Sequence, residues 1–305
     1  MVDNNIKIAA LGGDRRQAYA LAALLRRGRQ ISCIGLPEAN VRATCGDEIT
    51  VCEGIEEVLA DASFVLLPFP ASPDGVRISC PLDSEGALGE VKLATLLRLL
   101  SPSCVIIGGK LPPSFVMQAK DRGFRVYDML TADSFEIKNA YITAEAALSI
   151  AMNSLSKNIC GSRVAVTGFG RISKHLSRLL AALGAEVWVA ARKERDLAFA
   201  ETLGYKTIKI EGERWSDTLV SGFDVIYNTV PSKIFDRDFL LSVDKKTLLV
   251  ELASVPGGFD ICAAHELCAN ISWALSLPGK YAPESAGKIV AECVERVISG
   301  EVSAL

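Results

Sequence analysis

Short apolar runs alternate with segments of helical periodicity along the whole chain. In the first part the runs are nearly continuous in Val, Ile and Leu, the pattern of parallel strands that helices cover on both faces. Helical patterns such as residues 15–27 and 91–100 separate them. The alternation predicts βα units and a parallel sheet. The strands predicted here are residues 6–11, 31–35, 64–67, 105–108 and 124–127.

A long helical pattern at residues 141–156 leads into a second series of the same kind. Thr143 and Glu145 are predicted in its first turn, and Asn158 and Gly161 follow its end. A last helix is predicted to start near Pro283. The strands predicted for this series are residues 163–167, 186–190, 207–210, 224–228, 247–252 and 271–275.

The two series predict an α/β fold with two doubly wound parallel-sheet domains and a cleft between them. We expect an N-terminal, Rossmann-like domain at residues 1–138, joined by the C-terminal helix 283–305. A second domain at residues 139–282 is expected to begin with the linker helix 141–156. A length of 305 residues suits two domains, and the two could be copies of one topology.

Charge and hydropathy restrict the partners. The net charge of −3 offers no general attraction for nucleic acid or an anionic membrane. No apolar run approaches the roughly 20 residues that span a bilayer. The polar start Met-Val-Asp-Asn-Asn does not resemble a signal peptide. We therefore expect a cytoplasmic protein, with a homodimer as the default assembly for such folds.

The nine cysteines are scattered and form no Cys-x-x-Cys pair, and the chain has only two histidines, His175 and His265. Zinc sites have clustered Cys and His ligands. The pattern is typical of reduced thiols in a cytoplasmic protein and predicts no metal site.

A glycine turn, Gly168-Phe169-Gly170-Arg171-Ile172-Ser173, lies between a predicted strand and an apolar helix. This context is typical of a Rossmann dinucleotide-binding domain. The first glycine permits the tight turn, and the second lets the backbone approach a pyrophosphate at the helix N-terminus. Ser173 replaces the usual third glycine or alanine and is small enough for close packing.

The next strand distinguishes between nicotinamide cofactors. NAD enzymes usually carry an Asp or Glu about 20 residues after the first glycine, where it binds the ribose 2′-hydroxyl. Here that window holds Arg192 and Lys193, with no acid before Glu194. Cations suit the 2′-phosphate of NADP, and Arg171 could reach the same phosphate or the pyrophosphate. We therefore expect NADP rather than NAD, although Arg192 and Lys193 could also simply begin a solvated loop.

The chain also opens with a strand, a Gly12-Gly13-Asp14 turn and a helix. The spacing is not that of a dinucleotide site, but such a turn followed by arginines suits a small anion such as a substrate carboxylate. We expect Arg16 to bind this anion. A plain surface role is as good an interpretation for Arg15.

Six short stretches in order along the whole chain identify a resemblance to the family of the bacterial dipicolinate synthase A subunit. Two departures are Ile172-Ser173, where the family's cofactor turn has a small polar residue and a glycine, and Lys110, which matches no basic site of the family. The stretches are Gly12-Gly13-Asp14 with Arg16-Gln17, Asn139 with Thr143-Ala144-Glu145, Gly168-Phe169-Gly170-Arg171, Asn228-Thr229-Val230-Pro231, Leu252 to Gly258, and Leu277-Pro278-Gly279 with Ala282-Pro283 and Ala286-Gly287.

The resemblance implies NADP-dependent oxidation of a dihydro- or tetrahydrodipicolinate-type cyclic dicarboxylate, a branch of the lysine pathway, to dipicolinate for spore formation. It also implies that the partner is a separate protein, the B subunit of dipicolinate synthase, and that the location is the mother cell of a sporulating bacterium. The architecture is similar to that of D-2-hydroxyacid and alanine dehydrogenases.

Such a substrate needs partners for two carboxylates and an acceptor for one proton. For the carboxylates we expect the Gly12-Gly13 turn with Arg16, and the amides near Thr143 at the start of the linker helix. Glu145 in the same turn is the candidate base, or it only favours the helix dipole. Neither histidine is expected to be catalytic.

Strand-end loops should complete the site, because ligands bind outside the carboxyl ends of parallel strands. We expect Thr229-Val230-Pro231 and Ala253-Ser254 beside the nicotinamide, and Pro278-Gly279 beside nicotinamide and substrate. Two other functions remain open: a 2-oxo or 2-hydroxy acid dehydrogenase, disfavoured by the lack of a well-placed His, and a non-catalytic NADP-binding regulatory subunit.

Overall fold

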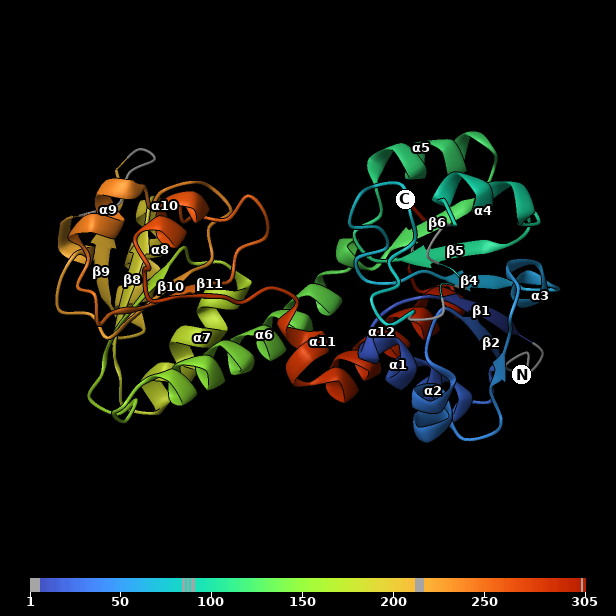
Figure 1. Cartoon of the computed structure of the whole chain (residues 1–305), viewed down its shortest axis with the longest axis horizontal. Helices are drawn as coiled ribbons and strands as arrows, with labels where there is room; N and C mark the ends of the chain where they lie inside the picture. The colour runs from blue at the N-terminus through green and yellow to red at the C-terminus, as the bar shows by residue number, and fades with distance from the viewer. Residues whose placement is uncertain (1–5, 84–85, 87, 89–90, 212–216, 303) are drawn as a thin grey trace. The chain divides into compact units, whose positions relative to one another are not determined.

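The computed structural model describes residues 6–83, 86, 88, 91–211, 217–302 and 304–305. The chain divides into two units (Figure 1). Unit 1 comprises Met1–Asn139 and Pro278–Leu305, and unit 2 comprises Ala140–Leu277. Each unit is described by itself below.

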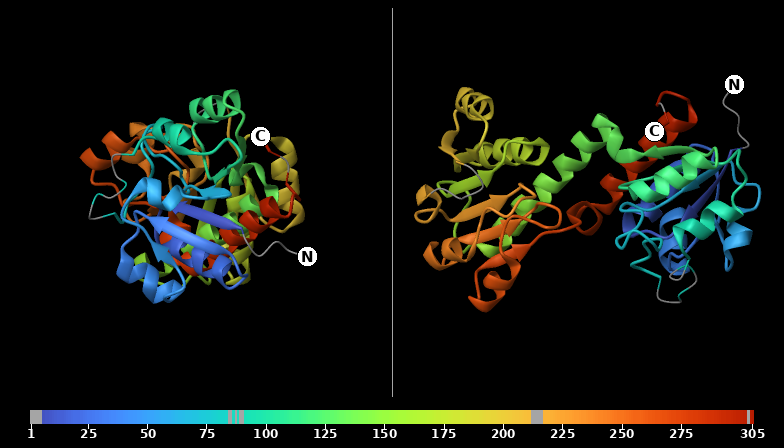
Figure 2. Two further views of the ribbon diagram at one scale, coloured as in Figure 1. Left: turned by 90° about the vertical axis from the view of Figure 1, so that its right-hand side faces the viewer. Right: turned by 90° about the horizontal axis from the view of Figure 1, so that it is seen from above.

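Among the described residues of unit 1, six strands form a wholly parallel sheet of order β3-β2-β1-β4-β5-β6. The β1 residues Ile8 to Leu11 are fully buried, because helices cover both faces of the sheet (Figure 1, Figure 2). The strands are β1 (Lys7–Leu11), β2 (Gln30–Ile34), β3 (Thr50–Val51), β4 (Phe64–Leu66), β5 (Val105–Gly108) and β6 (Arg125–Asp128). The helices are α1 (Arg15–Leu25), α2 (Glu38–Cys45), α3 (Ile55–Leu59), α4 (Leu93–Leu99), α5 (Pro113–Asp121) and α12 (Pro283–Ile298), with a 3-10 turn at Met129–Thr131.

The described part of unit 2 repeats this plan with the order β12-β11-β10-β7-β8-β9. Counted from its own first strand, this is the strand order of unit 1, so the two units are copies of one topology. The strands are β7 (Arg163–Thr167), β8 (Glu186–Ala191), β9 (Lys206–Lys209), β10 (Val225–Asn228), β11 (Leu248–Glu251) and β12 (Ile271–Trp273). The helices are α7 (Arg171–Ala182), α8 (Glu194–Thr202), α9 (Arg237–Ser242) and α10 (Ile261–Glu266), with a 3-10 turn at Asp217–Leu219. The predicted α/β class with two doubly wound parallel sheets is confirmed.

Helix α12 packs closely on α1 within unit 1 (Figure 1). Pro283 occupies its first turn, where the missing N–H costs nothing. A Cβ at Gly287 would lie 2.6 Å from the Tyr19 Cβ and 2.7 Å from the backbone oxygen of Arg16. Glycine therefore permits the close approach of the two helices. A buried ion pair between Arg29 and Glu295 adds a second attachment.

Helix α6 (Asp133–Ser154) begins earlier than the predicted linker helix 141–156. Asp133 and Glu136 lie in its first turn, where acids favour the helix dipole, and Phe135 supplies a buried apolar position. Thr143 and Glu145 are thus in the middle of a helix, nearly three turns (about 3.6 residues each) after its start. The prediction that backbone amides near Thr143 bind an anion was wrong, because amides in the middle of a helix donate to carbonyl oxygens of the preceding turn.

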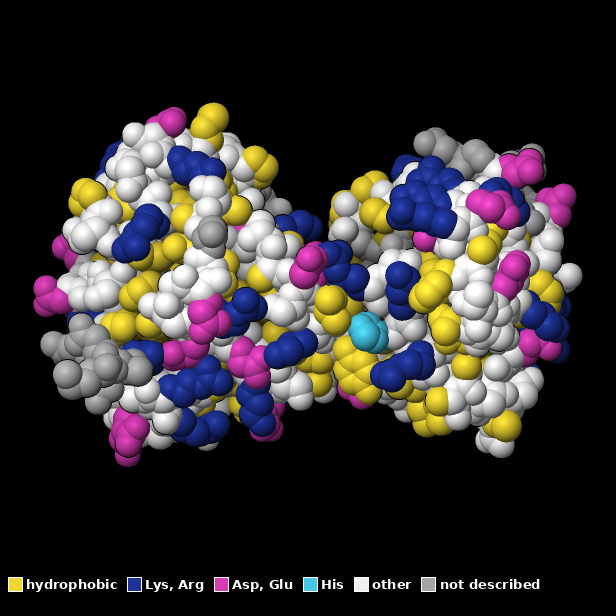
Figure 3. Space-filling model, turned by 180° about the vertical axis from the view of Figure 1, so that it is seen from behind, with side chains coloured by type: hydrophobic (Ala, Val, Ile, Leu, Met, Phe, Trp, Pro, Cys, Tyr) yellow, Lys and Arg dark blue, Asp and Glu magenta, His cyan; other side chains and the backbone are white. Residues whose placement is uncertain are grey.

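Pro278 and Gly279 lie in a short helix, α11 (Leu277–Tyr281), rather than in a strand-end loop. Proline is tolerated there because the first turn of a helix does not need its N–H. Basic and acidic side chains are interspersed on the face drawn in Figure 3. No helix of the described residues is long and apolar enough to cross a membrane.

Candidate functional site

The glycine turn of unit 2 connects β7 to α7. Gly168 has φ +83°, and a Cβ there would lie 2.8 Å from Thr229 Oγ1 and 3.0 Å from Val230 Cγ2. Any other residue would strain this turn and displace the loop after β10. Space is open around the Cβ position of Gly170, the N-cap of α7. The turn therefore leaves room for an anionic group at the N-terminus of a twelve-residue helix.

Ser173 occupies the third position of the motif without disturbing the packing. It is fully buried, and its hydroxyl donates a 3.2 Å hydrogen bond to the backbone oxygen of Gly170. Ile172 packs on the apolar core of unit 2, and Arg171 is exposed at the first residue of α7. The serine therefore substitutes for the usual small residue.

A pocket of about 130 Å³ lies beside this turn at the carboxyl ends of the strands. It brings together five of the predicted cofactor residues, and both cations, Arg192 and Lys193, are exposed there. The half-buried Asp196 in the first turn of α8 also lines it and was missed in the sequence. The lining is Gly168, Phe169, Ala190, Ala191, Arg192, Lys193, Asp196, Ile210, Val230 and Ile234.

Three buried polar residues lie at the ends of neighbouring strands: Thr167 on β7, Asn228 on β10 and Glu251 on β11. Thr167 Oγ1 donates to Asn228 Oδ1 at 2.7 Å, and Asn228 Nδ2 donates to Glu251 Oε1 at 2.7 Å. Thr229 Oγ1 donates to the backbone oxygen of Thr167. This network supports the loops holding the predicted residues Thr229 to Pro231 and Ala253 to Ser254.

In unit 1, the Gly12-Gly13 turn follows β1. Both glycines have positive φ, +57° and +103°. Their N–H groups donate to the backbone oxygens of Ile34 and Ser79, each at 2.8 Å. These amides therefore already have partners within the protein, and the prediction that they bind a substrate carboxylate stays untested.

Arg16 is almost fully buried, with 7% of its side chain exposed. Its Nε and Nη2 donate to the Asp14 carboxylate, Nη2 also donates to the Phe69 oxygen, and the guanidinium lies 5.0 Å from the centre of the Phe69 ring. Nη1 takes part in none of the hydrogen bonds found among the described residues. A Cβ at Gly279 would lie 2.4 Å from Asp14 Oδ2 and 2.9 Å from Arg16 Nε. Unit 1 thus brings together the predicted residues Asp14, Arg16 and Gly279.

The candidates on α6 differ in exposure. Thr143 is buried and Glu145 is exposed. His175 packs edge-on against Tyr141, with ring centres 5.4 Å apart, and His265 is exposed. Within the described part of the chain, no group of three or more His, Cys, Asp or Glu side chains could hold a metal ion.

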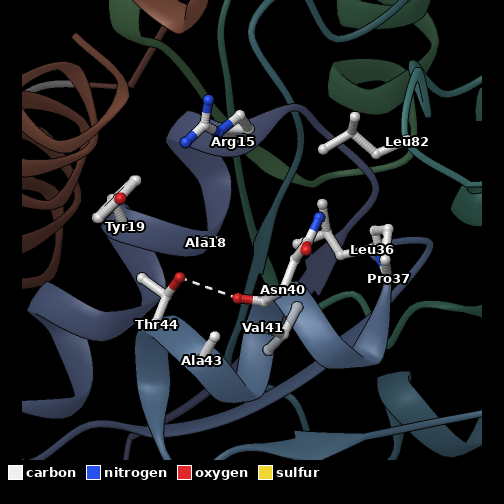
Figure 4. A pocket seen from close by; sticks show the side chains of 10 residues that line it. All are labelled: Arg15, Ala18, Tyr19, Leu36, Pro37, Asn40, Val41, Ala43, Thr44 and Leu82. Carbon is white, nitrogen blue, oxygen red and sulfur yellow. Dashed lines mark hydrogen bonds between the residues drawn. The ribbon is translucent and has the colours of Figure 1, made fainter.

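A separate pocket of about 440 Å³ lies between α1 and α2 of unit 1 (Figure 4). Arg15 and Tyr19 reach it from α1, and Asn40 and Thr44 from α2, where Thr44 Oγ1 donates to the Asn40 oxygen at 2.9 Å. Gly12, Gly13 and Arg16 are not among its lining residues. Arg15 therefore belongs to a different surface from Arg16.

Two units of one strand order, with a glycine turn and a cationic pocket in the second, define a two-domain Rossmann-type protein with the fold of a dehydrogenase. The sequence model for the N-terminal domain of the dipicolinate synthase A subunit matches residues 7–130. The chain is 30% identical over 298 residues to the dipicolinate synthase A subunit of Bacillus subtilis (strain 168), covering 96% of each protein. The chain belongs to the family of dipicolinate synthase A subunits.

Solved structures agree with this assignment. The crystal structure of the dipicolinate synthase A subunit from Bacillus halodurans is similar, with a TM-score of 0.81, 25% identity and coverage of 97% of this chain and 98% of that one. An L-alanine dehydrogenase shares the fold at a TM-score of 0.62 and 10% identity, covering 96% of this chain and 89% of that one. The second likeness concerns the fold alone.

Proposed function

We propose that this chain is the NADP-dependent, hydride-transferring A subunit of a dipicolinate synthase. It would oxidise a dihydrodipicolinate-type ring to dipicolinate, with one hydride passing from a ring carbon to NADP⁺ and one proton released. A tetrahydro substrate would need two such rounds. Family membership supports the substrate class, and the pocket beside the glycine turn, with Arg192 and Lys193, carries the cofactor assignment.

Each part of the cofactor has candidate partners in unit 2. The open space at Gly170 and the N-terminus of α7 suit the pyrophosphate. Arg192 and Lys193 suit a 2′-phosphate, because guanidinium and ammonium groups pair strongly with phosphate oxygens. When bound, NADP⁺ accepts the hydride. The loops after β10 and β11 would border its nicotinamide half.

The residues proposed for the substrate have separate tasks. Arg16 would pair with a carboxylate through Nη1, while Asp14 and Phe69 hold the other guanidinium nitrogens. Glu145, exposed on α6, would take the released proton directly or through water. Thr143, on the same helix, would donate a hydrogen bond from its hydroxyl group to a second carboxylate.

We also propose that the partner is the B subunit of dipicolinate synthase and that the chain acts in spore formation in the mother-cell cytoplasm, both supported by family membership.

Asp196 favours a second candidate, an NAD-dependent enzyme. Its carboxylate lines the same pocket as Arg192 and Lys193, and a carboxylate can accept a hydrogen bond from the ribose 2′-hydroxyl of NAD. The same charge would repel a 2′-phosphate. The choice of cofactor therefore depends on which of these side chains dominates the pocket.

The test is a titration of the purified chain with NADPH and NADH, followed by nicotinamide fluorescence. Arg192→Ala should weaken NADPH about 10- to 100-fold, the equivalent of one lost charged hydrogen bond, and leave NADH within about twofold. Arg237→Ala is the matched control, because Arg237 is exposed in the same unit and pairs with Glu266 outside the pocket. Equal weakening of both cofactors would refute the 2′-phosphate assignment. Loss of NADH binding in Asp196→Asn, with NADPH unaffected, would support NAD instead.

A further inference from the structure

The carboxylate of Glu251 is buried, 1% exposed, at the end of β11. Four N–H groups of described residues donate to it. Oε1 accepts from Asn228 Nδ2 at 2.7 Å and from the Ala253 amide at 2.9 Å. Oε2 accepts from the Gly258 and Phe259 amides at 2.7 and 3.1 Å. Each oxygen thus accepts two hydrogen bonds, the full capacity of an ionised carboxylate.

These bonds connect two loops that leave neighbouring strands. Asn228 holds the loop after β10, since its Oδ1 accepts from the Val230 amide at 3.1 Å and its Nδ2 donates to the Val230 oxygen at 3.0 Å. Glu251 holds the loop after β11 at both ends, at Ala253 and at Gly258. The 2.7 Å bond between Asn228 and Glu251 therefore fixes the separation of the two loops.

The glycines of the second loop fit this arrangement. A Cβ at Gly258 would lie 2.3 Å from Asn228 Nδ2, and one at Gly257 would lie 3.1 Å from Glu251 Oε2. Gly257 also has φ +77°. Only a chain without side chains at these positions can close around the carboxylate and the amide.

None of the ion pairs among the described residues includes Glu251, so hydrogen bonds alone offset the cost of burying its charge. If Glu251 only filled space in the core, a neutral side chain of similar size could take its place without the cost of burying a charge. Three of the four donors are backbone amides along the loop after β11, and the fourth is the side chain of Asn228, which holds the loop after β10; none of the lone pairs is left for a ligand. Glu251 can therefore influence a ligand only through the loops.

We propose that Glu251 is the positioning residue for the nicotinamide end of the cofactor site. Together with Asn228 it holds residues 229–231 and 253–254 in place without touching the cofactor. This inference rests on the proposed function, which assigns these two loops to the nicotinamide half. The pocket of Arg192 and Lys193, which would hold the adenosine half, is lined by Val230 of the first loop but by no residue of the second loop, and Glu251 does not line it.

The experiment compares two ligands on the purified full chain by calorimetry. NADPH occupies both halves of the site, and 2′,5′-ADP occupies only the adenosine half. Glu251→Gln keeps the side-chain volume but turns an N–H₂ group toward two N–H donors, which disturbs both loops. It should weaken NADPH about tenfold or more, and weaken 2′,5′-ADP, whose pocket shares only Val230 with the two loops, by about threefold or less. Glu266→Gln, an exposed residue of the same unit, should change neither affinity.

A purely structural role would weaken both ligands equally or neither, and either result overturns the inference. Gly258→Ala is the second variant, because it keeps the carboxylate while its Cβ displaces the Asn228 amide and the loop after β11. It should show the same selective loss. Thermal melting establishes that each variant is folded at the temperature of the titration. A wild-type chain that binds neither ligand would overturn the proposed function and this inference together.

Discussion

The ion pair between Arg29 and Glu295 gives a quantitative test of how α12 stabilises unit 1. Arg29 Nη2 lies 2.6 Å from Glu295 Oε2, and Nε lies 3.0 Å from Oε1. The two side chains are 5% and 19% exposed. The hydrogen bond to Glu295 raises the pKa of Arg29 above its ordinary value. Glu295→Ala therefore removes the carboxylate that this buried, permanently charged guanidinium contacts.

Removing one partner of a buried pair costs about 3–5 kcal/mol. Because Glu295 keeps some contact with water, we expect the lower end, about 3 kcal/mol. With a urea dependence of about 2 kcal/mol per M, the unfolding midpoint should fall by about 1.5 M. Far-UV circular dichroism follows both units. Tryptophan fluorescence follows unit 2, because all three tryptophans fall between residues 140 and 277.

Glu284→Ala is the matched control on the same helix. Glu284 pairs with Lys288 at 2.7 Å, but both side chains are more than half exposed, so this change should cost about 0.5 kcal/mol or less. Replacing the whole buried pair, as Arg29→Met with Glu295→Leu, should recover most of the lost stability. A Glu295→Ala midpoint no lower than that of Glu284→Ala would refute the reasoning.

Two further predictions concern the cysteines, which all lie in described segments and are all free. With Ellman's reagent on the native protein, the exposed Cys160, Cys262 and Cys268 should react quickly, the partly buried Cys45 and Cys80 more slowly, and the four buried thiols only after unfolding. Fast reaction of a buried thiol would contradict this order. The second concerns alkaline pH. Burial raises the pKa of the Cys80 thiol from 9.0 to about 12. Above pH 9 the thiol loses its proton in the unfolded chain before it does so in the folded protein. The contribution of the protonated Cys80 thiol to the free energy of unfolding is therefore complete below pH 9 and is lost as the pH rises toward 12. The loss is at most about 1.4 kcal/mol per pH unit in that window, and solvent around this partly buried thiol makes it smaller. Urea midpoints between about pH 8 and pH 10.5 should therefore decline less steeply in Cys80→Ala than in wild type, and equal slopes would count against the shift.

Hydrophobic periodicity predicted every described strand but β3, because a strand covered on both faces must be apolar along its length. Strand β3 (Thr50–Val51) was missed because its two residues, one of them exposed, form no apolar run. The start of α6 could not be predicted in this way. The segment before Tyr141 carries polar residues such as Asp133 and Glu136, and only the burial of Phe135 and Ala140 shows that it belongs to the helix. Helix α11 was also not predicted, because its Pro278-Gly279 pair is typical of a turn.

The cofactor turn could be predicted because its residues are consecutive, whereas the remaining residues of the site depend on contacts between distant segments. Glu251 looked like the polar end of an apolar strand, and its donors come from positions 228, 253, 258 and 259. Asp196 was missed because it follows Lys193 by one helical turn instead of ending the strand. No local pattern could have identified either carboxylate.

The docking of α12 on α1 also determines the order in which the molecule can be completed during synthesis. Unit 2 is one continuous stretch of chain, whereas unit 1 needs residues from both ends. Domains usually fold as they emerge from the ribosome, N-terminal first. Here the sheet of unit 1 emerges first, yet the α1 surface that receives Gly287 and the charge of Arg29 stay uncovered until the last helix is made. The unit that begins to form first is therefore completed last.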